Sequence, residues 1–179
     1  MADLFDLGSL PDAVPNHAGL VLPLVDGPRE WRVRLRFEVI GTPQQRGSKR
    51  PVRRGKAGTI LLIDDNKMSR DWMDRVACSA HAAWQGQPLL DEPLALSIIF
   101  YFHRPKSHFR TGKNAHLLRD SAPRDCLTSR DLAKLIRSTE DACTAVVWRD
   151  DKLVCHYLQP MGREYTEGSE MALVTVYSR

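Results

Sequence analysis

The sequence predicts an α+β domain with a small mixed β-sheet and two main helices packed on it. Strand patterns recur in both halves of the chain, whereas a sustained helical repeat of apolar residues is found at residues 67–84 and 131–143. Two helices are too few to cover both faces of a doubly wound sheet. A chain of 179 residues suits one domain with a sizeable core, which we place at residues 31–179.

Residues 1–30 predict a flexible acidic arm ahead of this domain. Four prolines and three glycines interrupt any regular repeat, and five acidic residues accompany a single basic one, Arg29. The run DLFDL at residues 3–7 resembles peptides that dock on bacterial sliding clamps, although chance hydrophobic residues in a mobile terminus are the simpler interpretation. A sliding clamp is an expected partner on this resemblance alone.

The first half of the domain predicts a strand, a basic loop, a second strand and a core helix. Residues 33–39 alternate apolar and charged side chains, as in a strand with one buried face. The loop over residues 44–58 contains no carboxylate, so it attracts a phosphate backbone unless it serves only solubility. Residues 59–63 form the second, short strand, and the helix follows at 67–84. The basic residues expected to bind DNA here are Arg46, Lys49, Arg50, Arg53, Arg54 and Lys56.

The second half begins with a strand at residues 94–102. Both of its faces are apolar, which predicts a central position in the sheet. Residues 103–129 show no periodicity, and we expect an irregular loop that faces DNA. Phe109 in this loop either stacks on an unpaired base or anchors the loop. The basic residues expected to contact phosphates here are Lys106, Arg110 and Lys113.

Two strands are expected at the end of the chain. Residues 152–159 and 171–177 carry strand patterns, and residues 160–168 form a turn between them. We expect the two strands to pair as an antiparallel hairpin, because consecutive strands usually lie side by side.

Acidic residues mark the start, middle and end of residues 130–154. Asp131 opens an amphipathic helix whose polar face carries Arg137, Ser138, Glu140 and Asp141, and the pair Asp150 and Asp151 precedes the next strand. Clustered carboxylates raise one another's pKa unless a cation joins them. Magnesium prefers such oxygen ligands, and the basic surroundings point to a phosphodiester substrate.

A purely structural interpretation of the same residues stays open. Asp131 can be a helix cap, and Asp150 and Asp151 can form a turn. Arg137 and Asp141 have the spacing of an ion pair on a helix surface.

The stretch resembles the RusA family of Holliday-junction resolvases, especially its phage-borne members. The family pattern is roughly D-x-D-[NK]-L-x-[KR], then D-A-L, then W-x-D-D before a hydrophobic strand. The resemblance extends to residues 105–108 and 111–114, and weakly to residues 41–43 and 47–50. The matching positions are Asp131, Lys134, Leu135, Arg137, Asp141, Ala142, Trp148, Asp150 and Asp151.

The resemblance implies a RusA-like fold and an endodeoxyribonuclease that uses Mg2+, with Mn2+ as a substitute. Such an enzyme acts as a homodimer, binds branched DNA and nicks two strands of a four-way junction symmetrically. Asp131, Asp150 and Asp151 would hold the metal, with Asp151 the stronger candidate of the pair. Arg137 would stabilise charge on the phosphate. The expected location is the cytoplasm of a bacterial host, with a phage as the source of the gene.

One departure from the family pattern bears on activity. The second carboxylate of the pattern falls on Ala133, which has no metal ligand. The chain is therefore either a natural variant or one in which a catalytic aspartate was replaced, and both predict weak metal binding, little turnover and retained junction binding. Glu140 is a second departure, because a hydrophobic residue is common there. A non-catalytic junction-binding protein and a general debranching nuclease remain as alternatives.

Other classes of protein fit the sequence poorly. No apolar run approaches the roughly 20 residues of a membrane span, so no membrane partner is expected. The four cysteines lack C-x-x-C spacing and predict reduced thiols, not a zinc site or disulfides.

Overall fold

The chain divides into two units, Met1–Glu30 and Trp31–Arg179. In the first unit, β1 (Ala13–Pro15) pairs antiparallel with β2 (Val21–Pro23). The rest of the expected arm, including the clamp-like run at residues 3–7, lies outside the described residues. The computed structural model describes residues 13–15, 21–23, 30–47, 49–54, 59–64, 68–127 and 130–179.

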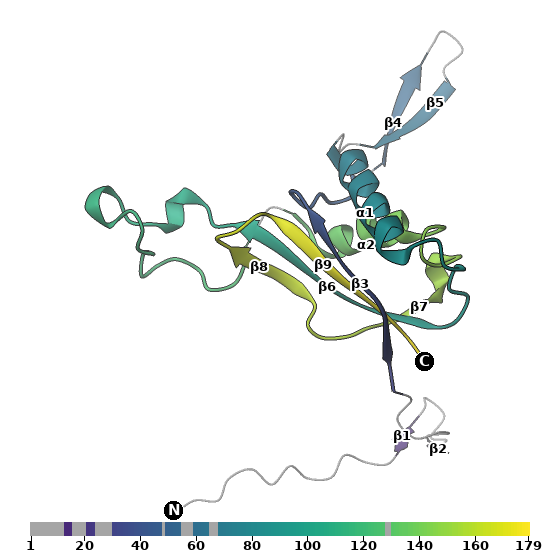
Figure 1. Ribbon diagram of the computed structural model, residues 1–179. Coiled ribbons are helices and arrows are strands. Elements are labelled where there is room, and N and C mark those ends of the chain that lie inside the picture. Colours follow the sequence, from purple (N-terminus) through teal and green to yellow (C-terminus); the bar gives the residue numbers. More distant parts are fainter. Residues whose placement is uncertain are drawn as a thin grey trace, which may run out of the picture. The chain divides into compact units, whose positions relative to one another are not determined.

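A mixed five-stranded sheet forms the centre of the second unit (Figure 1). Its order is β3 (Arg32–Ile40), β9 (Met171–Ser178), β6 (Leu94–His103) and β7 (Val154–Tyr157), and β8 (Gly162–Thr166) also pairs with β6. β9 runs antiparallel to both of its neighbours, whereas β7 and β8 run parallel to β6. The predicted mixed sheet and the central position of β6 are confirmed.

The predicted pairing of the last two strands is wrong. β9 lies between β3 and β6 and does not pair with β7 as a hairpin. The expected turn at residues 160–168 contains β8, which continues along the edge of β6 beyond β7. Both errors have one cause: pairing depends on backbone hydrogen bonds, and the side-chain alternation of a strand does not identify the partner of its backbone.

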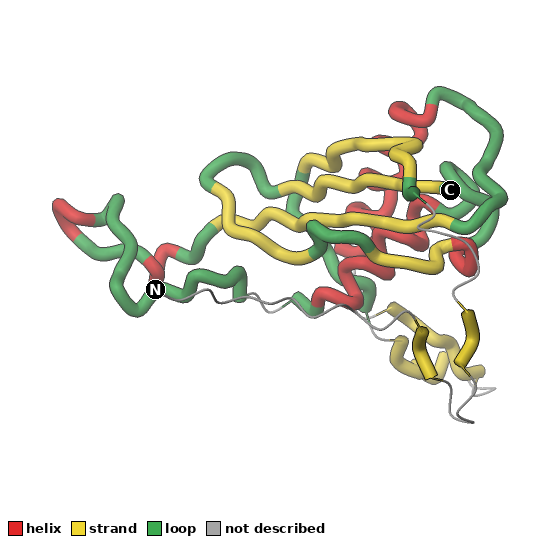
Figure 2. Tube along the Cα trace, turned by 90° about the horizontal axis from the view of Figure 1, so that it is seen from below, coloured by secondary structure: helices red, strands yellow, loops and turns green. Residues whose placement is uncertain are grey.

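Two helices cover one face of the sheet (Figures 1 and 2), as predicted. α1 (Met68–Trp84) contacts β3 and α2 (Leu132–Cys143), and the two helices share one core cluster with the sheet. Ser138 was expected on the polar face of α2, but it is fully buried. The buried face of this helix includes polar residues beside the apolar ones, so it is wider than the apolar pattern predicted. None of the helices in the described residues has the length and apolar character needed to cross a bilayer.

Large apolar side chains from both layers fill the core. Trp72 of α1, Phe100 of β6, Leu135 of α2 and Trp148 are each at most 1% exposed. Trp148 follows α2 directly, and its indole Nε1 donates a hydrogen bond to the Thr144 hydroxyl over 3.2 Å. The residues just before the acidic pair are therefore held in the core.

Both basic loops contain more regular structure than expected. β4 (Lys49–Arg54) and β5 (Thr59–Asp64) form an antiparallel hairpin, so the short second strand is confirmed but much of the predicted loop is itself a strand. Residues 104–127 follow β6, and we call this segment the excursion. It contains two short 3-10 helices, η1 (Lys106–His108) and η2 (Gly112–Asn114). It extends beyond the end of β6 (Figure 1).

The core makes a stability prediction for a matched pair of isoleucines. Ile98→Ala on β6 removes a side chain that is fully buried, and we expect it to lower the free energy of unfolding by about 2–5 kcal/mol. Ile40→Ala at the end of β3 removes one that is 54% exposed, and we expect a change of no more than about 0.5 kcal/mol. Urea denaturation measures both. Equal losses would contradict the central position of β6.

Candidate active site

Asp131 begins the helix that carries the candidate site. Its backbone is extended, and its Oδ1 accepts a hydrogen bond from the backbone N–H of Lys134 over 3.1 Å. This is a helix cap, as the structural interpretation predicted. The cap uses one carboxylate oxygen and leaves the side chain exposed. Asp131 therefore has a structural role whether or not it has a catalytic one.

One face of α2 lines a cavity of about 330 Å³. Residues spaced three or four apart along a helix share a face, and this places Ala133 and Arg137 in the same cavity. Asp151 and Tyr157 close it from the chain that leads into β7 and from β7 itself. The lining residues are Ala133, Ile136, Arg137, Glu140, Asp141, Asp151 and Tyr157. Two of the predicted catalytic residues, Arg137 and Asp151, thus line the same cavity as the position of the second family carboxylate, whereas Asp131 and Asp150 do not line it.

The two residues of the acidic pair have different places in a short turn. Asp150 caps η3 (Asp151–Leu153), where its Oδ1 accepts from the backbone N–H of Lys152 and its Oδ2 lies 3.1 Å from the Lys152 ammonium. The backbone hydrogen bond from Lys152 is the main cause of the lowered pKa of Asp150. Asp151 is the member of the pair that lines the cavity.

Glu140 was not predicted as a site residue. The Tyr157 hydroxyl donates to its Oε1 over 2.6 Å. Burial raises the pKa of Glu140, and the nearby Asp151 carboxylate raises it further, while the Tyr157 hydrogen bond opposes both effects. Burial likewise raises the pKa of Tyr157. The only signal in the sequence was the departure from a hydrophobic family position, because Tyr157 comes from a different element.

Asp141 pairs with Arg46, whereas the spacing in the sequence suggested an ion pair with Arg137. The Asp141 carboxylate forms an ion pair with the Arg46 guanidinium, and its side chain is only 18% exposed. The backbone N–H of Arg46 also donates to the carbonyl of Lys134 over 3.3 Å. These contacts fasten the segment after β3 to α2, so Arg46 is engaged in the fold and not simply presented to phosphate.

The residues present do not fit a three-carboxylate magnesium site. Within the described part of the chain, no three His, Cys, Asp or Glu side chains are grouped so that they could hold a metal ion. The chemistry of the nearby donors is suitable, since magnesium prefers carboxylate oxygen. Their arrangement is not, because neither Asp131 nor Asp150 lines the cavity that contains Asp151, and Ala133 contributes no oxygen to it.

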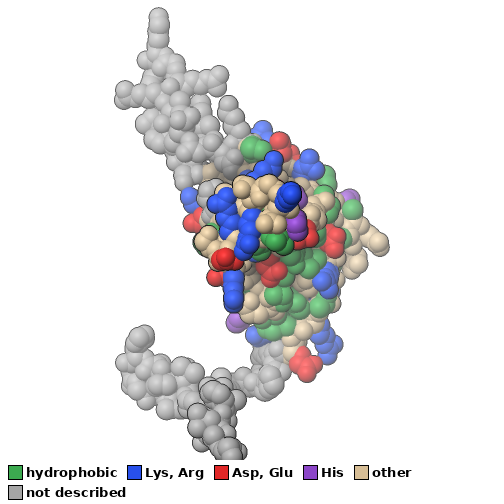
Figure 3. All heavy atoms as spheres, turned by 90° about the vertical axis from the view of Figure 1, so that its left-hand side faces the viewer, with side chains coloured by type: hydrophobic (Ala, Val, Ile, Leu, Met, Phe, Trp, Pro, Cys, Tyr) green, Lys and Arg blue, Asp and Glu red, His purple; other side chains and the backbone are tan. Residues whose placement is uncertain are grey.

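The other predicted DNA-binding residues are distributed over two elements. Lys106 and Lys113 are exposed on the excursion, and Arg110 forms an ion pair of 2.9 Å with Asp120. Figure 3 views the molecule from the side on which the excursion lies and shows Lys and Arg side chains interspersed with acidic ones. Lys56 lies outside the described residues. The remaining predicted DNA-binding residues belong to the strand β4 and are Lys49, Arg50, Arg53 and Arg54.

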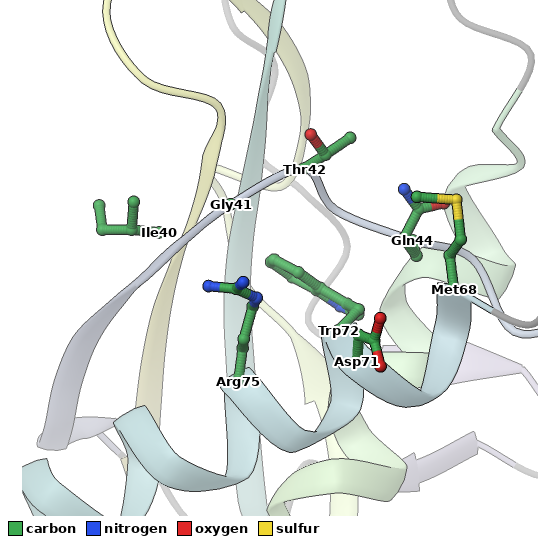
Figure 4. Close-up of a pocket in the computed structure, with 8 residues that line it drawn as sticks. All are labelled: Ile40, Gly41, Thr42, Gln44, Met68, Asp71, Trp72 and Arg75. Carbon is green, nitrogen blue, oxygen red and sulfur yellow. The ribbon is translucent and has the colours of Figure 1, made fainter.

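Gly41-Thr42-Pro43 lies at a second cavity, of about 360 Å³, between the end of β3 and α1 (Figure 4). Gly41 has φ 130°, a conformation that favours glycine. Its N–H donates to the Glu170 carbonyl over 2.9 Å, and the Thr42 hydroxyl bonds the Glu170 carboxylate over 2.5 Å. The motif therefore ties the end of β3 to the chain entering β9, which is a structural role.

The raised pKa of Glu140 predicts pH-dependent stability. Because the folded protein disfavours its charged form, the carboxylate destabilises the fold increasingly as the pH rises above the ordinary pKa of 4.5. Glu140→Gln removes this penalty, so the variant should be more stable than the parent near neutral pH and lose that advantage below about pH 4. Urea denaturation in the presence of EDTA measures the difference.

Glu38→Gln, at an exposed position on β3, is the matched control and should show a smaller pH-dependent change. If Glu140→Gln stabilised the protein equally at both pH values, altered packing and not ionisation would be the cause.

The chain matches the model of a known protein family. The family model for endodeoxyribonuclease RusA matches residues 37–170, well over half of the chain. The match includes α2, the excursion and the turn with Asp150 and Asp151. No curated protein matches the chain. The chain belongs to the RusA family of endodeoxyribonucleases, which are Holliday-junction resolvases.

Proposed function

We propose that this protein binds four-way DNA junctions and that its metal-dependent cleavage is weakened or lost at Ala133. The observation that carries the proposal is the shared cavity of Ala133, Arg137 and Asp151. A cation and a carboxylate flank a position that has lost the second carboxylate of the family pattern. Junction binding can persist without cleavage, because contacts to phosphates outside this cavity supply the affinity for DNA.

The proposed roles of the site residues follow from their positions. The carboxylates proposed to hold Mg2+, with Mn2+ as a substitute, are Asp131, Asp150 and Asp151, and an aspartate at position 133 would supply the oxygen ligands that are missing. Asp151 has the strongest support, because it lines the cavity. Arg137 would stabilise negative charge that develops on the phosphate.

Symmetric nicking of a junction requires two copies of the site. A four-way junction has approximate twofold symmetry, and a homodimer presents two sites related by the same symmetry. The basic residues of β4 and the exposed lysines of the excursion would contact phosphates. We place this activity in the cytoplasm of a bacterial host, with a phage as the source of the gene.

Ala133 also favours a second candidate function. A family member without a complete set of carboxylates can serve as a non-catalytic protein that recognises junction structure. The absence of a metal-binding group among the described residues is in line with this alternative. The experiment below separates it from the first proposal.

Ala133→Asp should bring back metal-dependent nicking of a four-way junction. We expect a rise on the order of 100-fold or more, because charge stabilisation at a metal site is worth several kcal/mol. Ala133→Asn has nearly the same shape without the charge and should remain inactive. The measurements are cleavage of an end-labelled junction with Mg2+ and calorimetric titration of Mg2+ into each variant. Linear duplex and flap substrates are the controls.

The possible outcomes separate the candidates. Paired nicks in the junction from the aspartate variant alone, with tighter Mg2+ binding, would support a resolvase that lacks one ligand. Tight junction binding by all variants without cleavage by any would leave a junction-binding protein. Equal cleavage of flaps and junctions would indicate a debranching nuclease.

A further inference from the structure

A third cavity, of about 430 Å³, lies where the excursion meets the carboxyl ends of β6 and β8. His103 and Thr166 are the last residues of these parallel strands and are paired in the sheet. Phe109 and Leu118 of the excursion and Tyr165 of β8 supply apolar lining. None of the residues assigned above to the candidate active site contributes to it.

The excursion holds Phe109 and Leu118 in place through its backbone. The two residues form a β-bridge, and the N–H of Arg110 donates to the Leu117 carbonyl over 2.8 Å. The N–H of Arg119 donates to the His108 carbonyl over 2.9 Å, and its side-chain Nε reaches the Phe109 carbonyl over 2.7 Å. The expected irregular loop is therefore closed by hydrogen bonds on both sides of Phe109.

Tyr165 forms a fixed wall of the cavity. The Arg104 guanidinium lies 4.0 Å from the centre of its ring, and the His108 ring meets it edge-on with centroids 5.6 Å apart. Its hydroxyl accepts a hydrogen bond from the N–H of Leu127 over 3.2 Å. Arg104 in turn donates to the Pro123 carbonyl over 2.8 Å. The wall is pre-organised, which lowers the cost of binding a ligand against it.

Phe109 is not needed as an anchor for the excursion. The backbone bridge and the contacts of Tyr165 already fasten this segment, and Phe109 is outside the buried core cluster. Its half-buried ring instead lines the cavity. Leu118 beside it is 42% exposed. Two apolar side chains are thus kept at the cavity by a segment that backbone hydrogen bonds also hold closed.

The cavity and the excursion around it suit a ligand with a flat ring, polar groups at the edge of that ring and a negatively charged chain. Apolar walls with a few polar groups are typical of ligand sites. The polar groups that line this cavity and can bond the edge of such a ring belong to His103, Arg104, His116, Thr166 and Glu167, whose carboxylate can accept from a ring amino group. The excursion around it carries six basic and two acidic residues, which attracts phosphates. The basic residues are Arg104, Lys106, Arg110, Lys113, Arg119 and Arg124, and the acidic ones are Asp120 and Asp125.

We infer that this cavity holds an unpaired nucleobase of branched DNA, stacked on Phe109. The inference rests on the proposed function for its substrate, branched DNA. Stacking of a base on an aromatic side chain does not require a particular sequence. The cavity would thus recognise the opened base at a branch point, which a continuous duplex does not offer.

β8 links this cavity to the start of α2. Tyr165 holds Leu127, and Arg163 donates to the carbonyl of Arg130 over 2.6 Å. Arg130 directly precedes Asp131, the helix cap. Because Tyr165 and Arg163 both belong to β8, this strand would fix the position of a base bound against Tyr165 relative to the start of α2.

The test compares Phe109→Ala with Lys113→Ala. Lys113 is an exposed cation of the same excursion that does not line the cavity. We expect Phe109→Ala to weaken binding to a four-way junction roughly tenfold and to leave linear duplex binding unchanged. Lys113→Ala should weaken both DNAs alike and reduce the salt dependence of binding. Fluorescence anisotropy at several salt concentrations measures these affinities.

Two further measurements separate stacking from a structural role of Phe109. Phe109→Leu keeps an apolar side chain without a ring, so it should bind as weakly as Phe109→Ala if stacking matters and as tightly as the parent if Phe109 is an anchor. A junction with abasic nucleotides at the branch point should bind the parent as weakly as the intact junction binds Phe109→Ala. Phe109→Ala should then cause no further loss.

The outcomes distinguish this inference from the proposed function. If the parent protein does not prefer the junction over duplex, the proposed function fails. If the junction preference is present but neither Phe109→Ala nor the abasic nucleotides reduce it, the nucleobase cavity is wrong and the proposed function stands. Restoration of binding by Phe109→Leu would also overturn the inference.

Discussion

The hydrogen bonding of β6 along both of its edges decides where the two candidate sites lie. β9 occupies one edge in antiparallel orientation, and two short strands share the other in parallel orientation. β7 pairs with the first residues of β6, beginning at Leu94, and β8 pairs with its last residues, ending at His103. The cavity with Tyr157 therefore lies toward one end of the strand, and the cavity with Tyr165 toward the other. Because β6 is buried on both faces, neither position can shift without disturbing the core.

Three carboxylates lie around the cavity of the candidate active site. Glu140, Asp141 and Asp151 border one cavity, where burial raises the pKa of Glu140 and the Asp151 carboxylate raises it further. Arg46 compensates Asp141, and the Tyr157 hydroxyl partly compensates Glu140. Ala133 adds no charge to these carboxylates. A further carboxylate at that position would add to the repulsion among them, and a bound metal ion would offset that repulsion.

The proposed function assigns affinity and positioning to different parts of the molecule. Basic residues on the backbone of β4 and on the excursion are suited to phosphates, which supply affinity but carry no information about the structure of the DNA. A cavity that accepts an extruded base responds to an opened branch point. β8 connects that cavity to the segment before Asp131 through Tyr165 and Arg163. Recognition of the branch and the approach to α2 are thereby mechanically related.

Features whose cause is local could be predicted from the sequence. The period of apolar residues predicted α1, α2 and β3 because burial repeats with the geometry of each element, and a continuous apolar run predicted the central strand β6. The position of Asp131 before α2 predicted a cap because the first N–H groups of a helix lack partners within it. The motif around Asp131 and Asp150 also identified the family.

Contacts between residues that are distant in sequence became visible in the folded chain alone. β9 lies between β3 and β6, and charged residues make a strand in β4, because backbone groups form a ladder whatever side chains they carry. Arg46 reaches Asp141, Tyr157 reaches Glu140, and the turn at η3 directs Asp151 but not Asp150 to the cavity. Each of these contacts exists because the sheet brings separate elements together, and no local pattern of residues records which elements will meet.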